Sequence, residues 1–192
     1  MSKTLASYWR FLLAGLSKRG QTGAFLPSQR FLIDKMIAPV PPDYSGQILE
    51  LGAGTGALTR RLASQRPAAR ILACEINPVL ARDLEYNIAS AGLSNRIHVL
   101  SDSAERVMTR QTSRGARRPD FIISGIPLGN LPRAMVFALV EQIHDTLAPG
   151  GMYIQFQYTL IDRKKIKATF ARLRTGLAPL NLPPAFVYFA TK

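Results

Sequence analysis

Short apolar runs alternate with helix-like segments along most of this chain. The apolar and β-branched runs predict strands at residues 47–52, 70–76, 96–101, 120–125, 152–158 and 185–190. Amphipathic spacing predicts helices at residues 57–65, 78–91, 132–147 and 162–173, and a short helix that starts near Ser103. Strands that alternate with helices are typical of a parallel sheet with right-handed crossovers. The pattern therefore predicts an α/β fold.

Residues 1–44 precede the first predicted strand and show a different pattern. We expect them to form a helical lead-in, which the stiff segment Pro39-Val40-Pro41-Pro42 joins to the sheet. The predicted organisation therefore has two parts, an N-terminal amphipathic lead-in at 1–44 and a sheet domain at 45–192.

The net charge of the chain limits the kinds of binding partner that we expect. The 192 residues include 25 Lys and Arg against 12 Asp and Glu, which gives a net charge of +13. Such an excess attracts nucleic acids or acidic membrane surfaces and does not choose between them. The single cysteine, Cys74, excludes an intramolecular disulfide framework and suits a reducing compartment. No apolar run approaches the ~20 residues that cross a bilayer, and Arg10 interrupts the apolar N-terminal stretch, so we expect a cytoplasmic protein.

The segment QILELGAGTG ends the first predicted strand on a carboxylate, Glu50, and continues into glycines at every second position. A glycine-rich turn at the carboxyl end of a parallel strand lets a ligand approach the backbone. The spacing differs from the G-x-G-x-x-G of dinucleotide-binding turns, and Glu50 would repel a pyrophosphate. The same carboxylate suits a cationic amine or sulfonium. S-adenosyl-L-methionine carries both and has no phosphate.

Glu50-Leu51-Gly52-Ala53-Gly54-Thr55-Gly56 resembles the E/D-x-G-x-G-x-G motif of class I S-adenosylmethionine-dependent methyltransferases. The resemblance implies a Rossmann-like, mostly parallel seven-stranded sheet with helices on both faces. It also implies that the cofactor contacts a set of residues at the ends of the first three strands: Glu50, Gly52, Ala53, Gly54, Thr55, Gly56, Glu75, Ile76, Asp102 and Ser103. In this family the acidic residue after the second strand binds ribose, and the third strand end holds the adenine edge. Helix capping is the alternative role for Glu75 and Asp102.

The fourth predicted strand runs into Ser124-Gly125-Ile126-Pro127-Leu128. Methyltransferases that act on base amines carry a D/N/S-P-P-Y/F or N-L-P-Y/F tetrad here, whose first side chain accepts from the amine and whose aromatic stacks on the base. Gly125 and Leu128 occupy those two positions, so both functions are missing. Asn130-Leu131-Pro132-Arg133 lies too late to replace the tetrad, and we expect it only to turn the chain.

The segment from Ser124 to Pro132 instead resembles the S-G-L-P-L…L-P segment of bacterial phospholipid N-methyltransferases. Three further segments are similar to motifs of that family: Gly23 to Ser28, Gln155 to Tyr158, and Asn181 to Tyr188. The departures are Gln157 in place of a threonine and Gln29 where a second serine is frequent. The resemblance implies transfer of up to three methyl groups to the amine of phosphatidylethanolamine, giving phosphatidylcholine and S-adenosyl-L-homocysteine.

A membrane-anchored substrate requires a docking element, and residues 3–19 are the candidate. At ~100° per residue one face of this segment is apolar and aromatic, with cations around it, which is typical of a helix lying in the headgroup region. The residues predicted to bind the membrane are Leu5, Tyr8, Trp9, Leu12, Leu13, Leu16, Lys18 and Arg19. A helix that packs its apolar stripe over the sheet remains the alternative. The protein is thus expected at the cytoplasmic face of the inner membrane, as a peripheral protein.

The acceptor side of the site is predicted from strand ends. Tyr158 is the candidate to hold the headgroup, because its ring can attract a methylated ammonium. Gln155, earlier on the same strand, could assist, and Tyr153, two residues before Gln155 and on its strand face, is a weaker candidate. Ser124 and Gly125 complete the predicted catalytic set. Ser28 and Gln29 are expected at the methionine end of the cofactor, and no metal-ligand cluster is present in the sequence.

Two alternatives stay open from the sequence. Ser28-Gln29-Arg30-Phe31-Leu32 is also similar to the G-Q-N/H-F-L motif of rRNA adenine dimethyltransferases, and the positive charge would suit RNA. The missing tetrad argues against that activity. The other alternative is a non-catalytic protein that binds S-adenosylmethionine.

Overall fold

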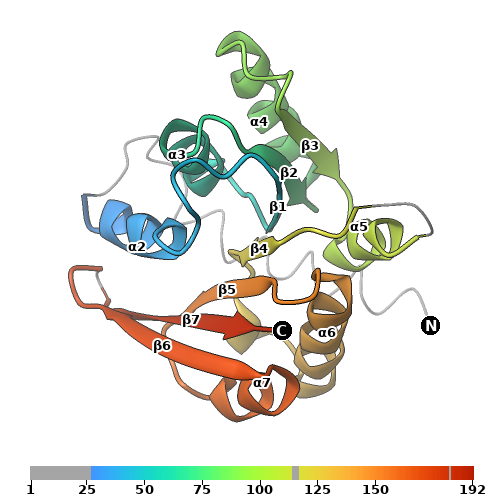
Figure 1. Cartoon of the computed structure of the whole chain (residues 1–192). Helices are drawn as coiled ribbons and strands as arrows, with labels where there is room; N and C mark the ends of the chain where they lie inside the picture. The colour runs from blue at the N-terminus through green and yellow to red at the C-terminus, as the bar shows by residue number, and fades with distance from the viewer. Residues whose placement is uncertain (1–26, 114–116, 182) are drawn as a thin grey trace.

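The computed structural model describes residues 27–113, 117–181 and 183–192 (Figure 1). In this part, seven strands form a single sheet in the order β3-β2-β1-β4-β5-β7-β6. The strands are β1 Gln47–Leu51, β2 Arg70–Glu75, β3 Ile97–Ser101, β4 Phe121–Ser124, β5 Met152–Gln157, β6 Arg172–Ala178 and β7 Ala185–Thr191. The helices are α2 Pro27–Ile37, α3 Ala57–Gln65, α4 Pro78–Ser90, α5 Ala104–Gln111, α6 Arg133–Thr146 and α7 Arg163–Thr169, with a 3₁₀ turn η1 at Leu128–Asn130.

Helices cover both faces of the sheet, as Figure 1 shows. The buried side chains of α2, α3 and α4 form one apolar cluster with one face, and those of α5, α6 and α7 form a second cluster with the other. β1 to β5 pair in parallel, whereas β7 is antiparallel to both β5 and β6. The predicted Rossmann-like α/β fold is therefore confirmed, with a mixed sheet at one edge.

The sixth strand is the element that the sequence pattern misplaces. We expected a basic helix to continue to residue 173, but α7 ends at Thr169 and β6 begins at Arg172. β6 is an edge strand with arginines in alternate positions, and Arg174 lies over the Phe189 ring at 4.6 Å. Charged residues are common on edge strands because they prevent pairing with other chains. They also hide the apolar alternation that predicts a strand.

Local signals for the helix ends are confirmed in α4. The Asn77 side chain caps the helix by accepting from the Val79 and Leu80 amides, and Pro78 occupies the first turn. Gly92 follows the helix in the left-handed region, with φ of 68°. Proline in the first turn of a helix and glycine just after its last turn both cost little free energy.

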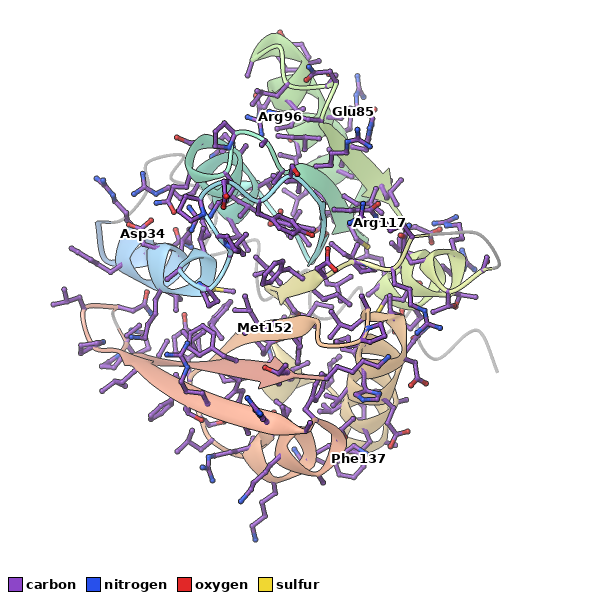
Figure 2. All side chains as sticks on the ribbon, in the orientation of Figure 1. Asp34, Glu85, Arg96, Arg117, Phe137 and Met152 are labelled. Atoms are coloured by element: carbon purple, nitrogen blue, oxygen red, sulfur yellow. The ribbon has the colours of Figure 1, made fainter. Side chains whose placement is uncertain are left out.

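α2 packs on the sheet and does not stand apart from it. Leu32, Ile33, Met36 and Ile37 are buried in the cluster of that face. Asp34, labelled in Figure 2, accepts from Arg61 Nε at 2.7 Å and so ties α2 to α3. The predicted membrane helix at 3–19 and the Gly23 to Leu26 part of the family motif lie outside the described residues. Within the described ranges, none of the helices is both long enough and apolar enough to span a bilayer.

Candidate active site

The glycine loop after β1 lies at the carboxyl edge of the sheet. Gly52, Gly54 and Gly56 all adopt positive φ, at 76°, 56° and 77°, a conformation that costs other residues roughly 1–2 kcal/mol. A side chain on Gly56 would meet Leu84 Cδ1 at 2.3 Å, so this glycine allows α3 and α4 to pack. A side chain on Gly54 would meet nothing within 4 Å. Gly54 therefore faces open space that a ligand can fill.

Glu50 is the penultimate residue of β1, just before this loop, and is 1% exposed. Neither carboxyl oxygen has a hydrogen-bond partner among the described residues. Burial raises the pKa of Glu50 to about 8; the nearby Thr59 hydroxyl lowers it in part, and the charge of Glu75 raises it further. A buried carboxyl without partners is costly unless a charged or hydrogen-bonding group reaches it. A cationic ligand in the open loop would supply that group.

Glu75 ends β2 and is also buried, at 5% exposure. Its two oxygens accept from backbone amides, Oε2 from Gly54 at 2.7 Å and Oε1 from Asn77 at 2.8 Å. Glu75 is thereby fixed against the middle of the glycine loop, and Ile76 beside it is half-buried. The predicted pair of carboxylates thus lies at one site, on two neighbouring strands.

Asp102 and Ser103 follow β3, and both have partners within the protein. Ser103 Oγ accepts from the Arg106 amide and so caps α5, which is the alternative role considered for this strand end. Asp102 pairs with Arg110 at 2.7 Å and accepts from the Ser103 amide at 2.8 Å. Burial raises the pKa of Asp102, but these contacts outweigh it and hold the pKa below its usual value.

The segment after β4 packs directly on the glycine loop. The Gly125 amide donates to Leu51 O at 2.8 Å, and a Cβ on Gly125 would lie 2.8 Å from Gly52 O. Ser124 is fully buried, and its Oγ accepts from the Ile126 amide at 3.2 Å. Gly125 is thus required by backbone contact between two loops, which explains why no amine-accepting side chain stands there.

Tyr153 and Gln155 form a buried pair of hydrogen-bonded side chains, here called the polar strut, which supports the segment after β4. Tyr153 donates its hydroxyl to Gln155 Oε1 at 2.8 Å, and Gln155 Nε2 donates to Ile126 O at 3.0 Å and to Phe156 O at 2.7 Å. Both side chains are fully buried, and burial raises the pKa of Tyr153. Gln155 therefore holds the Ile126 carbonyl in place, and Tyr153 lies beneath the site and not at its surface.

Tyr158 follows β5 and is 47% exposed at the carboxyl edge. Its ring packs edge-on against Phe156, with centroids 5.8 Å apart. Gln29, at the start of α2, is also exposed, and Ser28 belongs to the same first turn. The aromatic face of Tyr158 is consequently available to a ligand.

The residues present fit S-adenosylmethionine. A partnerless buried carboxyl lies beside open backbone at Gly54, and a second carboxylate at Glu75 is fixed nearby. Residues 48–151 match a family model described as a methyltransferase domain, which covers more than half of the 192 residues. The chain belongs to the class I S-adenosylmethionine-dependent methyltransferases.

Curated relatives of this methyltransferase are of several kinds, and two of them bear directly on the acceptor. An ornithine lipid N-methyltransferase from Singulisphaera acidiphila is 28% identical over 183 residues, which cover 93% of this chain and 94% of the relative. A ribosomal RNA small subunit methyltransferase A from Listeria welshimeri is 30% identical over 146 residues, which cover 70% of this chain but only 46% of the relative. The match to the lipid enzyme runs end to end, and the match to the RNA enzyme does not.

Solved structures share the fold of this methyltransferase at low sequence identity. A precorrin-6y C5,15-methyltransferase from Geobacter metallireducens superposes with a TM-score of 0.68 and 13% identity, covering 89% of this chain and 93% of that one. A Thermus thermophilus 16S rRNA methyltransferase, solved with AdoMet and guanosine, superposes with a TM-score of 0.67 and 22% identity. The match covers 90% of this chain and 45% of that one. These likenesses support the class I fold.

Sequence reasoning missed two features of this methyltransferase site. The contact of Gly125 with the glycine loop depends on strand register and has no local signal in the sequence. The link from Tyr153 to Gln155 did have a signal, because residues two apart on a strand share a face. What the pattern could not reveal is that both side chains are fully buried.

Proposed function

We propose that this methyltransferase transfers methyl groups to the headgroup amine of phosphatidylethanolamine and its partly methylated forms, toward phosphatidylcholine, at the cytoplasmic membrane surface. The observation that carries the proposal is the end-to-end match to a lipid N-methyltransferase, over 93% of this chain and 94% of the relative. The phospholipid motifs at both ends of the chain favour a phospholipid acceptor. The glycine at 125, in place of an amine-accepting side chain, argues against a nucleobase.

The cofactor residues have distinct roles in this proposal. Glu50 interacts with the positive end of the cofactor through its partnerless carboxyl, and Glu75 accepts from the ribose hydroxyls. Asp102 and Ser103 border the adenine, while Ser28 and Gln29 border the methionine end. When bound, S-adenosylmethionine supplies a methyl group that its sulfonium already activates, so the protein contributes mainly position and orientation.

On the acceptor side, Tyr158 holds the headgroup. Its exposed ring attracts the methylated ammonium of partly methylated lipids through a cation–π interaction of about 0.5–2 kcal/mol. The nitrogen must approach uncharged, with its lone pair toward the methyl group, and it releases one proton for each methyl group that it gains. Gln155, Ser124 and Gly125 contribute by fixing the backbone after β4. The segment 3–19 provides membrane attachment through its apolar face.

Labelled S-adenosylmethionine tests the proposal. The protein is incubated with vesicles that contain phosphatidylethanolamine and ornithine lipid, and with structured RNA in a parallel mixture, and the products are separated by chromatography. We expect label in mono-, di- and trimethylated phosphatidylethanolamine. Label confined to ornithine lipid would contradict the phospholipid assignment, and label confined to RNA would contradict a lipid acceptor altogether.

A further inference from the structure

Large apolar side chains are exposed mainly at one edge of the described structure. Of the nine such residues there, six have 44% to 61% exposure, and the five of these other than Tyr158 come from three separate segments: Phe31, Leu160, Ile161, Leu177 and Leu180. We call these five residues the apolar rim. Tyr158, the proposed headgroup residue, lies at its inner border. Clusters of this kind mark interaction sites far more often than scattered exposed residues do.

Strand register places two of the rim segments side by side. Phe186 of β7 pairs with Gln157 of β5 on one side and with Leu177 of β6 on the other. Adjacent strands lie about 4.8 Å apart, so Gln157 and Leu177 are separated by about 10 Å. The rim residues that follow β5 and β6 therefore begin at the same level of the sheet, at the carboxyl edge that carries the glycine loop.

α2 brings Phe31 to the same edge. Lys35 packs against Gly176 of β6, where an added Cβ would lie 2.6 Å from Lys35 Cε. Ala38, directly after the end of α2, lines a hollow with Arg174, so the helix runs from Arg174 toward the end of β6 when followed backward. Phe31 lies about one turn, some 6 Å, beyond Lys35 in that direction. Figure 1 shows the start of α2 beside the turn between β6 and β7.

The charges around the rim are positive. The described segments 27–35, 158–165 and 174–181 contain the following cations: Arg30, Lys35, Arg163, Lys164, Lys165, which pairs with Glu141, and Arg174. Their carboxylates are Asp34, which pairs with Arg61, and Asp162, which is buried and pairs with Arg133. Lys35 and Arg174 line one hollow of about 330 Å³ behind the rim. Apolar side chains with cations nearby match the layers of an anionic bilayer, acyl chains first and phosphates above.

We propose that the apolar rim inserts into the surface of an anionic phospholipid bilayer and places the mouth of the cofactor site against the headgroups. This docking surface is separate from the segment 3–19, and it rests on the proposed lipid substrate for its purpose. Insertion of Leu160 and Leu180 on either side of β7 would hold Tyr158 at the headgroup level. A lipid amine could then reach the glycine loop without leaving the membrane.

Substitution of the rim in the full chain tests this. The paired variants Leu160→Ser with Ile161→Ser, and Leu177→Ser with Leu180→Ser, should each bind vesicles of phosphatidylglycerol and phosphatidylethanolamine at least tenfold more weakly in flotation. The control is Tyr86→Ser, which removes a large side chain that is 72% exposed on α4, and it should bind as the unmodified chain does. Equal binding by the rim variants and the control would overturn the proposal.

A gain-of-signal experiment covers the case in which a serine variant folds poorly. In a Trp9→Phe chain, Leu180→Trp places the sole tryptophan on the rim, and Tyr86→Trp places it on α4. Vesicles should shift the emission of the rim tryptophan to the blue, and brominated lipid should quench it, with neither effect at position 86. An unchanged rim signal with vesicles would overturn the proposal. So would a rim signal already shifted without vesicles, which would mean that residues 1–26 or a second copy cover the rim.

Detergent-dispersed phosphatidylethanolamine separates this inference from the proposed function. In micelles the lipid no longer requires docking on a bilayer, so the rim variants should transfer methyl groups within about twofold of the unmodified chain. Rim-dependent vesicle binding without transfer to any lipid would leave the docking surface intact and refute the proposed function. Transfer of methyl groups to lipid, together with vesicle binding that does not depend on the rim, would support the proposed function and refute the docking surface.

Discussion

Glu50 is the site residue whose carboxyl is buried without a partner in the described structure. It has no hydrogen-bond partner among the described residues, and its pKa rises to about 8. Without a ligand it therefore stays protonated at neutral pH, and a bound cation favours the ionised form. One residue thus couples cofactor binding to protonation.

The first prediction concerns the stability of the ligand-free protein. Between the ordinary value of 4.5 and about 8, the folded state holds a proton on Glu50 that the unfolded state has released. The free energy of unfolding should therefore fall as pH rises through this window, by up to about 1.4 kcal/mol per pH unit from this group. Glu50→Gln removes this contribution. Urea unfolding at pH 5 and pH 8 should show a smaller loss of stability in the variant, and an equal loss would contradict the pKa assignment.

A second prediction separates two glycines of one loop. Gly54→Ala fills open space, whereas Gly56→Ala meets Leu84 at 2.3 Å, and both residues have positive φ. We expect Gly54→Ala to cost roughly 1–2 kcal/mol of stability from backbone strain and to weaken cofactor binding. Gly56→Ala should cost more stability because packing must also shift. Thermal melts and calorimetry measure the two effects, and equal melting temperatures would refute the distinction.

At the scale of elements, the sequence pattern located the parallel core and its ligand loops because these signals are local. A buried parallel strand is a continuous apolar run, and glycine and proline mark the turns. The edge strand β6 was missed since its arginines obscure the alternation. The contact between the loops after β1 and β4 could not be predicted, because Gly125 meets Gly52 through strand register. The polar strut of Tyr153 and Gln155 could not be predicted either, because it depends on the burial of both side chains.

A third prediction tests that strut. Gln155→Leu keeps the volume but leaves Ile126 O without its donor, which should cost about 1–3 kcal/mol locally and displace the segment after β4. We expect about tenfold lower kcat, with the affinity for S-adenosylmethionine changed less than twofold. Tyr153→Phe retains the bond from Gln155 to Ile126 and serves as the control, with kcat near normal. Loss of cofactor affinity in Gln155→Leu would contradict a role confined to the acceptor side.

At the scale of the whole molecule, the charge and the apolar rim act on the same partner. The net charge of +13 draws the chain toward anionic surfaces from a distance, and the rim provides short-range apolar contact. The rim and the glycine loop lie at one edge of the sheet, so attraction to the membrane also orients the site.

The fourth prediction concerns the screening of surface charges by salt. Raising ionic strength from about 0.1 M to about 1 M shortens the screening length from about 10 Å to about 3 Å. Binding of the full chain to anionic vesicles should weaken at least tenfold, whereas affinity for S-adenosylmethionine should change less than threefold because Glu50 is buried. Flotation and calorimetry in the same salt series give both numbers. Similar losses of vesicle binding and of affinity for S-adenosylmethionine would show that cofactor binding depends on surface charge and not on the buried site.

Calorimetry of cofactor binding tests the central claim most directly. S-adenosylmethionine is titrated at pH 7 into the unmodified chain and Glu50→Gln, in two buffers of different ionisation enthalpy. We expect the unmodified chain to release close to one proton more than the variant does and to bind S-adenosylmethionine at least tenfold more tightly. Equal affinity and equal proton release would contradict this expectation, as would absent heat with S-adenosylmethionine beside clear binding of a pyrophosphate coenzyme.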